Sequence, residues 1–169
     1  MNIKDRQDCE SNIRRIEELL GCGIFYQENA GHILQVSAFI DLMICLRDLM
    51  HKTEKYAQKI DFTDDILVND YVTDVSDAIR AVRDACCHID SFKRNFDENG
   101  NRGSHNIAYG RCNFMRKGDL ELKSEYEDDA AVFYGMNRLY FKRHIIRAFE
   151  ESKALLAAHL NAPYTQQIT

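Results

Sequence analysis

The chain has 169 residues, of which 45% are hydrophobic and 29% charged, and its formal net charge is −5 at pH 7. This length and this balance predict a single globular domain with one hydrophobic core. The negative charge argues against a broad, sequence-independent grip on nucleic acid, which depends on many Lys and Arg contacts to phosphates, but it is compatible with a small basic site.

The first residues and the distribution of apolar residues predict a cytoplasmic protein. No apolar run approaches the roughly 20 residues that a membrane span requires. The opening sequence, MNIKDRQDCESNIRR, is charged and lacks the apolar segment of a secretory signal. We therefore expect no membrane partner, and we expect the six cysteines to be free thiols.

Three helices are expected in the first half of the chain. The first spans about residues 4–20 and is ended by glycine. The second is long, about residues 29–60, because its apolar residues recur at helical spacing. An acidic loop at 61–74 follows, and Thr73 is a suitable N-cap for a third helix over about 74–92.

The second half of the chain has the character of short strands before it returns to helix. A glycine-containing loop is expected at 97–105. The last helix is expected at about 142–160 and a disordered tail at about 162–169. Between them, two strand pairs with their turns are predicted: 106–114 with 119–124 around 117–119, and 131–135 with 138–141 around 136–137.

Together these elements predict one mainly α domain over residues 1–169. Its expected architecture is a four-helix bundle. A small antiparallel β insertion, at about 105–141, separates the third helix from the fourth.

The stretch RDACCHID, residues 83–90, lies in the third predicted helix and carries several reactive side chains. At 100° per residue, Asp84 lies about 100° and His88 about 140° from Arg83, on one side of the helix. The valine, isoleucine and alanine residues lie on the opposite half, so we expect Arg83 and His88 to bound an outward polar arc. Asp84 and His88 are i, i+4 neighbours and are expected to touch.

The two adjacent cysteines allow other interpretations of this stretch. Cys86 is expected to point into the core and Cys87 outward, so the pair cannot close a disulfide within a regular helix. A zinc site needs about four converging ligands, and Cys87 and His88 have no CxxC or HxxxH partner. We therefore expect no metal and no cofactor, with a redox or metal sensor built on Cys86, Cys87 and His88 kept as an alternative.

The pattern of Arg83, four residues and His88 resembles the Arg-x4-6-His signature of the HEPN superfamily. Proteins of this family are small and all-α, and many are metal-independent endoribonucleases. The family prefers a polar residue directly after the arginine, which Asp84 supplies, and the resemblance extends over roughly residues 29–160. In the family the motif usually lies near the start of the last helix, whereas here it lies in the third.

A second match to the same pattern runs from Arg138 to His144, with five residues between them. It straddles a predicted strand-to-helix junction and has Leu139 where the family prefers a polar group. We interpret this match as coincidental. The cations at the start of the last helix are interpreted first as a surface patch and second as an RNA contact: Lys142, Arg143, His144 and Arg147.

The resemblance implies an endoribonuclease whose nucleophile is the 2′-hydroxyl of the RNA itself, with Arg83, His88 and Asp84 as catalytic residues. Histidine transfers protons near neutral pH, and arginine offers a fixed fork of donors to phosphate oxygens. Asp84 can orient the imidazole and favour its protonated form. HEPN proteins typically pair as two-fold dimers, so a homodimer would bring two motifs to one cleft.

A further contact to the RNA substrate is expected from Arg80, on the same arc. Arg47 and His51, which are i, i+4 neighbours on the long helix, are candidates to line the same cleft, and the alternative for them is a solvated polar stripe. The implied role is that of the toxin in a toxin–antitoxin or phage-defence system, with a cognate antitoxin protein as a further partner. The alternative is a catalytically inactive, HEPN-like helical dimer that binds a protein partner or a nucleotide and uses the motif for interface salt bridges.

Overall fold

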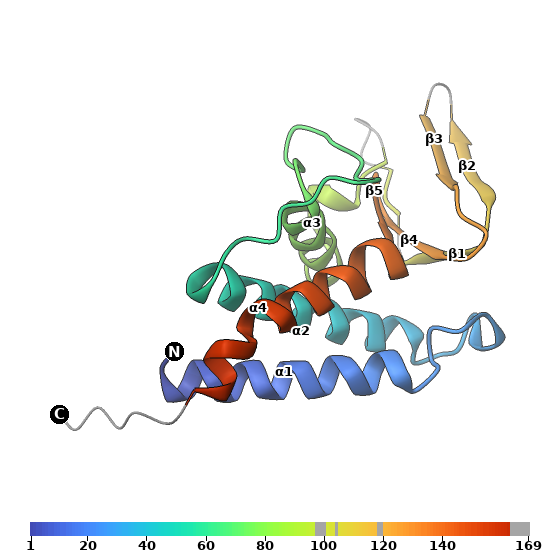
Figure 1. Cartoon of the computed structure of the whole chain (residues 1–169). Coiled ribbons are helices and arrows are strands. Elements are labelled where there is room, and N and C mark those ends of the chain that lie inside the picture. The colour runs from blue at the N-terminus through green and yellow to red at the C-terminus, as the bar shows by residue number, and fades with distance from the viewer. Residues whose placement is uncertain (97–100, 104, 118–119, 163–169) are drawn as a thin grey trace.

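The computed structural model describes residues 1–96, 101–103, 105–117 and 120–162. In these segments four α-helices form a helical core, and short antiparallel strands are inserted between the third and the fourth helix (Figure 1). Three predicted features lie wholly or partly outside the described residues: the tail from 163 onward, positions 97–100 and 104 of the loop, and positions 118–119 of the turn.

The helix α1 (Ile3–Gly21) begins after Asn2, whose side-chain oxygen accepts a hydrogen bond from the Asp5 N–H at 2.7 Å. The Asp5 carboxylate is nearly buried and accepts hydrogen bonds from Lys52 and from the Tyr56 hydroxyl. The Lys52 ammonium is the main reason that the pKa of Asp5 lies well below its ordinary value. Asp5 therefore fixes the start of α1 against the end of the second helix.

The helix α2 (Gln35–Tyr56) is shorter than predicted at both ends. Before it, a 3₁₀ turn (Gln27–Asn29) and Gly31, whose φ is +80°, occupy the place of the first predicted turns. Glycine adopts this left-handed backbone at little cost, and a regular helix cannot pass through it. The inward face of α2 forms the centre of the core with its buried residues Phe39, Leu42, Met43, Cys45, Leu46, Leu49 and Met50.

The helix α3 (Val75–Cys87) is capped by Asp74 rather than by the predicted Thr73. The Asp74 carboxylate accepts a hydrogen bond from the Asp77 N–H at 3.0 Å. The Thr73 hydroxyl instead donates to the Asp77 carboxylate at 2.6 Å. The helix ends at Cys87, not near residue 92, and this difference changes the position of His88.

The strands form two antiparallel units. β1 (Asn106–Tyr109), β4 (Ala130–Tyr134) and β5 (Asn137–Tyr140) make a three-stranded sheet in the order β1-β4-β5. β2 (Cys112–Lys117) and β3 (Leu120–Ser124) pair only with each other. The prediction of a single strand at 106–114 is therefore wrong. The chain turns at Gly110, whose φ is +73°, so the residues before it pair with β4 and the residues after it pair with β3.

The last helical segment starts with a π-helical turn (Phe141–Ile146) and continues as α4 (Arg147–Asn161). The buried carboxylate of Asp129 accepts hydrogen bonds from the N–H groups of Lys142 and Arg143, at 2.9 and 3.2 Å. A carboxylate at this end satisfies backbone donors that have no partner within the helix and interacts favourably with the helix dipole. The predicted helix at about 142–160 agrees with these bounds.

The central element of the core is α2, which packs on α1, α3 and α4, while α3 also packs on β4 and β5. Figure 1 shows the strands at one end of the helices, with the β2–β3 hairpin projecting away from them. A second, smaller apolar cluster joins the two sheets through Ala108, Leu122, Ala131, Phe133 and Tyr140. In the described segments, no helix has both the length and the apolar character needed to cross a bilayer.

Candidate functional site at the end of α3

Arg83 lies near the C-terminal end of α3, with 38% of its side chain exposed. Its guanidinium donates a hydrogen bond to one Asp84 oxygen at 2.9 Å. The other Asp84 oxygen accepts a hydrogen bond at 2.6 Å from Lys93, in the 3₁₀ turn Phe92–Arg94. A guanidinium carries five N–H donors, so Arg83 keeps donors for a phosphate while it is bonded to Asp84.

His88 is not on the helix, contrary to the prediction. It follows the last helical residue, Cys87, with extended backbone (φ −121°, ψ 107°), and its N–H donates to the Asp84 carbonyl at 3.0 Å. Among the described residues the predicted side-chain contact between Asp84 and His88 is not formed, because the carboxylate bonds the two cations named above. The imidazole is instead exposed at the end of α3.

The two cysteines of this stretch differ in burial, as predicted. Cys86 packs against the core, and burial raises the pKa of its thiol to about 12. Cys87 is exposed, and all six cysteines are free thiols. A thiol with a raised pKa is a poor nucleophile and a poor metal ligand near neutral pH, so Cys86 offers no support for the redox or metal-sensor alternative.

A small pocket between α2 and α3 brings together the three residues predicted to bind substrate. Arg47 and His51 line it from α2, and Arg80 lines it from α3. Arg80 and Arg83 are one helical turn apart, about 4.5 Å along the axis. The pocket has a volume of about 110 Å³, and its other lining residues are Met50, Glu54, Lys59, Ser76 and Asp77.

The basic residues of this pocket differ in how far they are already neutralised. Arg80 forms an ion pair with Asp77 at 2.7 Å. Within the segments that the structure describes, neither Arg47 nor His51 forms an ion pair or a side-chain hydrogen bond. An anion entering the pocket can therefore bind Arg47 and His51 without breaking an ion pair of either residue, although Glu54 and Asp77 also line the pocket.

Two further cations lie near the end of α3 and were not among the predicted site residues. Lys93, whose side chain is only 15% exposed, is held by Asp84. Arg102 donates a hydrogen bond to the Ile89 carbonyl at 3.1 Å, beside the turn that follows His88. The sequence offers only the basic run FKR as a signal for Lys93, since its approach to Asp84 depends on the turn between them.

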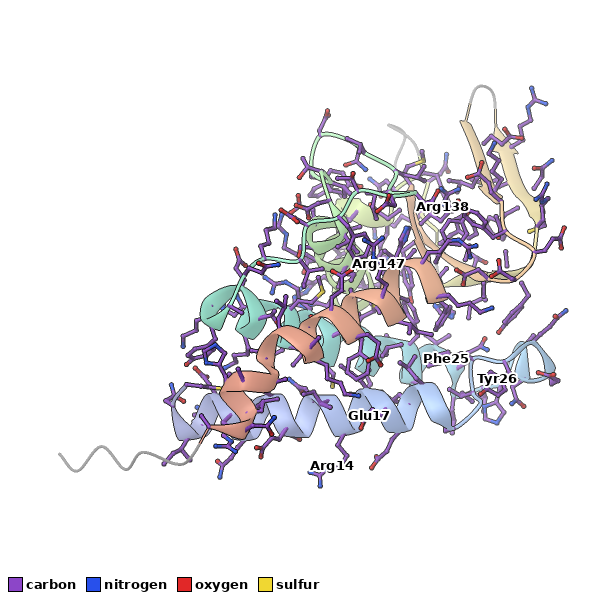
Figure 2. The ribbon with its side chains drawn as sticks, in the orientation of Figure 1. Arg14, Glu17, Phe25, Tyr26, Arg138 and Arg147 are labelled. Carbon is purple, nitrogen blue, oxygen red and sulfur yellow. The ribbon has the colours of Figure 1, made fainter. Side chains whose placement is uncertain are left out.

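The second Arg-to-His match is buried. Arg138, labelled in Figure 2, is 5% exposed, donates to the Asp65 carbonyl and stacks on the Tyr140 ring. His144 is fully buried, its Nδ1 accepts from the Tyr140 N–H at 3.1 Å, and its Nε2 lies 3.0 Å from the Asp64 carbonyl oxygen. Both side chains stabilise the core, which agrees with the interpretation of this match as coincidental.

Of the four basic residues predicted as a surface patch at the start of the last helix, Lys142 and Arg147 are exposed and Arg143 is partly exposed, whereas His144 is buried. Arg143 is bonded to Asp129 at 3.0 Å, and Arg147 to Asp64 at 2.9 Å. His144 is buried, as described above. Carboxylates thus pair with Arg143 and Arg147, the exposed Lys142 lies 3.7 Å from Asp128, and the fourth basic residue, His144, does not reach the surface.

One buried and one partly buried histidine predict a stability that falls in mild acid. The His105 ring contacts the rings of Phe39 and Tyr134, and within the described segments neither of its ring nitrogens has a hydrogen-bond partner. Burial lowers the pKa of His105 and of His144 from 6.5 to about 4. Between pH 6.5 and pH 4 the unfolded chain binds more protons than the folded one. The free energy of unfolding is therefore at its full value above pH 6.5 and decreases as the pH falls. Near pH 4 the loss is about 3 kcal/mol per histidine.

Urea unfolding at pH 7 and at pH 4.5 measures this loss. The substitution His105→Phe keeps an aromatic ring against Phe39 and Tyr134 but removes the titrating group, so it should remove roughly half of the pH dependence. An unfolding free energy that is the same at both pH values in the wild type would show that the two histidines are not held neutral by the fold.

Comparisons with protein-family models, with curated proteins and with solved structures find no match to this chain. Its function is therefore inferred from its own residues. Of the predicted site residues, Arg47, His51 and Arg80 line one pocket, whereas Arg83 lies one turn further along α3 and His88 follows the end of that helix. We call these five residues together the α2–α3 surface.

Proposed function

We propose that the chain is a metal-independent endoribonuclease of the HEPN type that acts in the cytoplasm as a homodimer. The observation that carries the proposal is the α2–α3 surface, where a pocket lined by both basic and acidic residues includes Arg80, one helical turn from Arg83. His88 is exposed at the end of the same helix. Arginine and histidine side chains are groups that phosphodiester transfer can use without a metal ion.

The proposed chemistry uses the 2′-hydroxyl of RNA as the nucleophile. His88 takes the proton from this hydroxyl or gives one to the leaving oxygen, as histidine can near neutral pH. Arg83 binds the non-bridging phosphate oxygens and stabilises the charge that develops on them. Asp84 acts as a positioning residue for Arg83, which differs from the role in orienting His88 that we expected from the sequence.

A second copy of the chain would complete this site. One histidine per chain can serve one of the two proton transfers, and a two-fold dimer supplies the second imidazole together with a second guanidinium. Apolar side chains that favour association lie exposed beside the motif: Ile89 is 73% and Phe92 62% exposed. Exposed apolar residues grouped at one place commonly mark an interaction surface.

An endoribonuclease that cuts cellular RNA without restraint would harm the cell that makes it. We therefore place the protein in a toxin–antitoxin or phage-defence system, where a cognate antitoxin protein would restrain it. The antitoxin would act either by covering the α2–α3 surface or by preventing the two copies from pairing.

Incubation of the purified protein with total cellular RNA in EDTA tests the proposal. We expect discrete RNA fragments in EDTA. An oligonucleotide that spans a mapped cleavage site should resist cleavage when 2′-deoxyribose replaces the ribose at that site, because the nucleophile is then missing. Cleavage that stops in EDTA and returns with Mg²⁺, or that proceeds equally on the deoxy substrate, would rule out the proposed chemistry.

A second candidate is a catalytically inactive HEPN-like dimer that binds a protein partner or a nucleotide. The ion pairs that join Arg83, Asp84 and Lys93 favour it, because such a network can serve the fold or an interface rather than a phosphate. A stable dimer that leaves all RNA intact would support this candidate against the nuclease.

A further inference from the structure

A second cavity lies away from the α2–α3 surface, between the end of α1, the loop that follows it, and the start of the last helical segment. It has a volume of about 380 Å³ and shares no lining residue with the pocket between α2 and α3. Figure 2 shows Phe25 and Tyr26 in this region, between the end of α1 and the strands. Sites for small organic molecules have volumes of roughly 300–1,000 Å³, so the cavity is large enough for one.

The wall of this cavity includes four aromatic residues, and hydrogen bonds hold one of them, Tyr109, in place. The rings of Phe25 and Phe141 contact each other with centroids 5.0 Å apart, and Tyr26 is 58% exposed at the opening. The Tyr109 hydroxyl accepts a hydrogen bond from Gln35 at 3.0 Å, and Gln35 also binds the backbone of the loop before α2. The cavity is therefore preformed rather than created by a mobile side chain.

The charge of the cavity is negative. Asp128 and Asp129 are each bonded to Arg143 at 3.0 Å, so their charges are compensated. In the described part of the chain Glu28 forms no ion pair, and Glu127 comes no closer than 3.7 Å to an exposed arginine. Four carboxylates and one ammonium line the cavity in total: Glu28, Glu127, Asp128, Asp129 and Lys142.

We propose that this cavity binds a small organic cation, an ammonium or guanidinium carried on an apolar body. The apolar body would pack on Phe25 and Phe141, and Tyr26 would offer its ring face to the positive charge. Glu28 and Glu127, which are both exposed at the cavity, would supply the opposite charge. The same carboxylates repel phosphate, so this ligand is chemically distinct from the RNA proposed for the α2–α3 surface.

The probe for this proposal is 2-phenylethylammonium, which places a positive charge beside one aromatic ring. Its titration into the full-length, ¹⁵N-labelled protein at pH 7 should shift the amide signals of Gly110 and Glu28 in a saturable manner. The neutral counterpart, 2-phenylethanol, should bind at least about tenfold more weakly. The substitution Glu28→Gln should weaken binding of the cation at least about fivefold without altering thermal unfolding, because Glu28 is exposed.

A matched variant separates this local effect from the overall charge of the protein. Glu150→Gln removes one negative charge from an exposed position in the first turn of α4, away from the cavity lining, and should leave the affinity unchanged. Equal binding of the alcohol and the amine would overturn the proposal, as would unchanged affinity in Glu28→Gln. A titration without saturable shifts at Gly110 and Glu28 would overturn it as well.

Discussion

Replacement of either Arg83 or His88 by alanine is expected to lower the rate of RNA cleavage in EDTA by at least about 100-fold. Arg83→Ala removes the charge that faces the phosphate, and His88→Ala removes a proton-transfer group. Arg83 is partly exposed and His88 is exposed, so neither change should leave a cavity in the core. Fragment release from labelled RNA measures the rate, and thermal unfolding checks that each variant is folded.

Matched controls come from the same residue types elsewhere on the surface. Arg14 points away from the helical core on the outer side of α1 (Figure 2), and His32 is exposed before α2. Arg14→Ala and His32→Ala should cleave RNA at the wild-type rate. Full activity in either Arg83→Ala or His88→Ala would exclude that residue from the mechanism.

Gly135→Ala is expected to destabilise the fold by about 4 kcal/mol or more. Gly135 lies in the turn between β4 and β5 with φ of +55°, and a Cβ atom there would lie 2.5 Å from the Lys93 carbonyl oxygen. It would also lie 2.8 Å from the Arg94 carbonyl carbon and 2.8 Å from the Asn95 carbonyl oxygen. These are backbone atoms, so the segment that carries Lys93 must move away from the sheet.

Gly31→Ala separates the steric cost from the conformational one. Gly31 also has a positive φ, +80°, but a Cβ atom there meets nothing within 4 Å. The Gly31→Ala substitution should lower the free energy of unfolding by only about 1–2 kcal/mol, which is the penalty for a left-handed backbone at a residue with a side chain. Chemical unfolding of both variants measures the difference, and equal losses would show that the segment at 93–95 can yield.

The helices were predictable from apolar periodicity, and so were the ends of α1 and of the last helical segment, but the ends of α2 and α3 were not. Ile89 continues the apolar period of α3, which is why the sequence predicts helix to residue 92. In the structure the helix ends at Cys87 and Ile89 is 73% exposed. Apolar periodicity indicates which residues suit a helix face. It does not indicate that Gly31, before α2, and Gly110, after β1, adopt a left-handed backbone conformation that interrupts regular structure.

The candidate site was predictable where residues share one helix. Arg47 and His51 meet in one pocket because they are i, i+4 neighbours, and Arg80 joins them because α3 packs on α2. The contact of Lys93 with Asp84 was missed because it depends on a turn. The cavity beside Phe25 and Phe141 is lined by residues from 20–28 and from 109–146. These segments lie far apart in the sequence, so no local sequence pattern predicts that they are close together in the fold.

The chemical ends of the RNA fragments formed in EDTA test the central claim most directly, namely that Arg83 and His88 direct the 2′-hydroxyl of RNA against its own phosphodiester. Attack by this hydroxyl expels the 5′-oxygen, so mass spectrometry should find 2′,3′-cyclic phosphate and 5′-hydroxyl ends. Fragments that carry 3′-hydroxyl and 5′-phosphate ends would show that water is the nucleophile, and they would contradict the proposed mechanism.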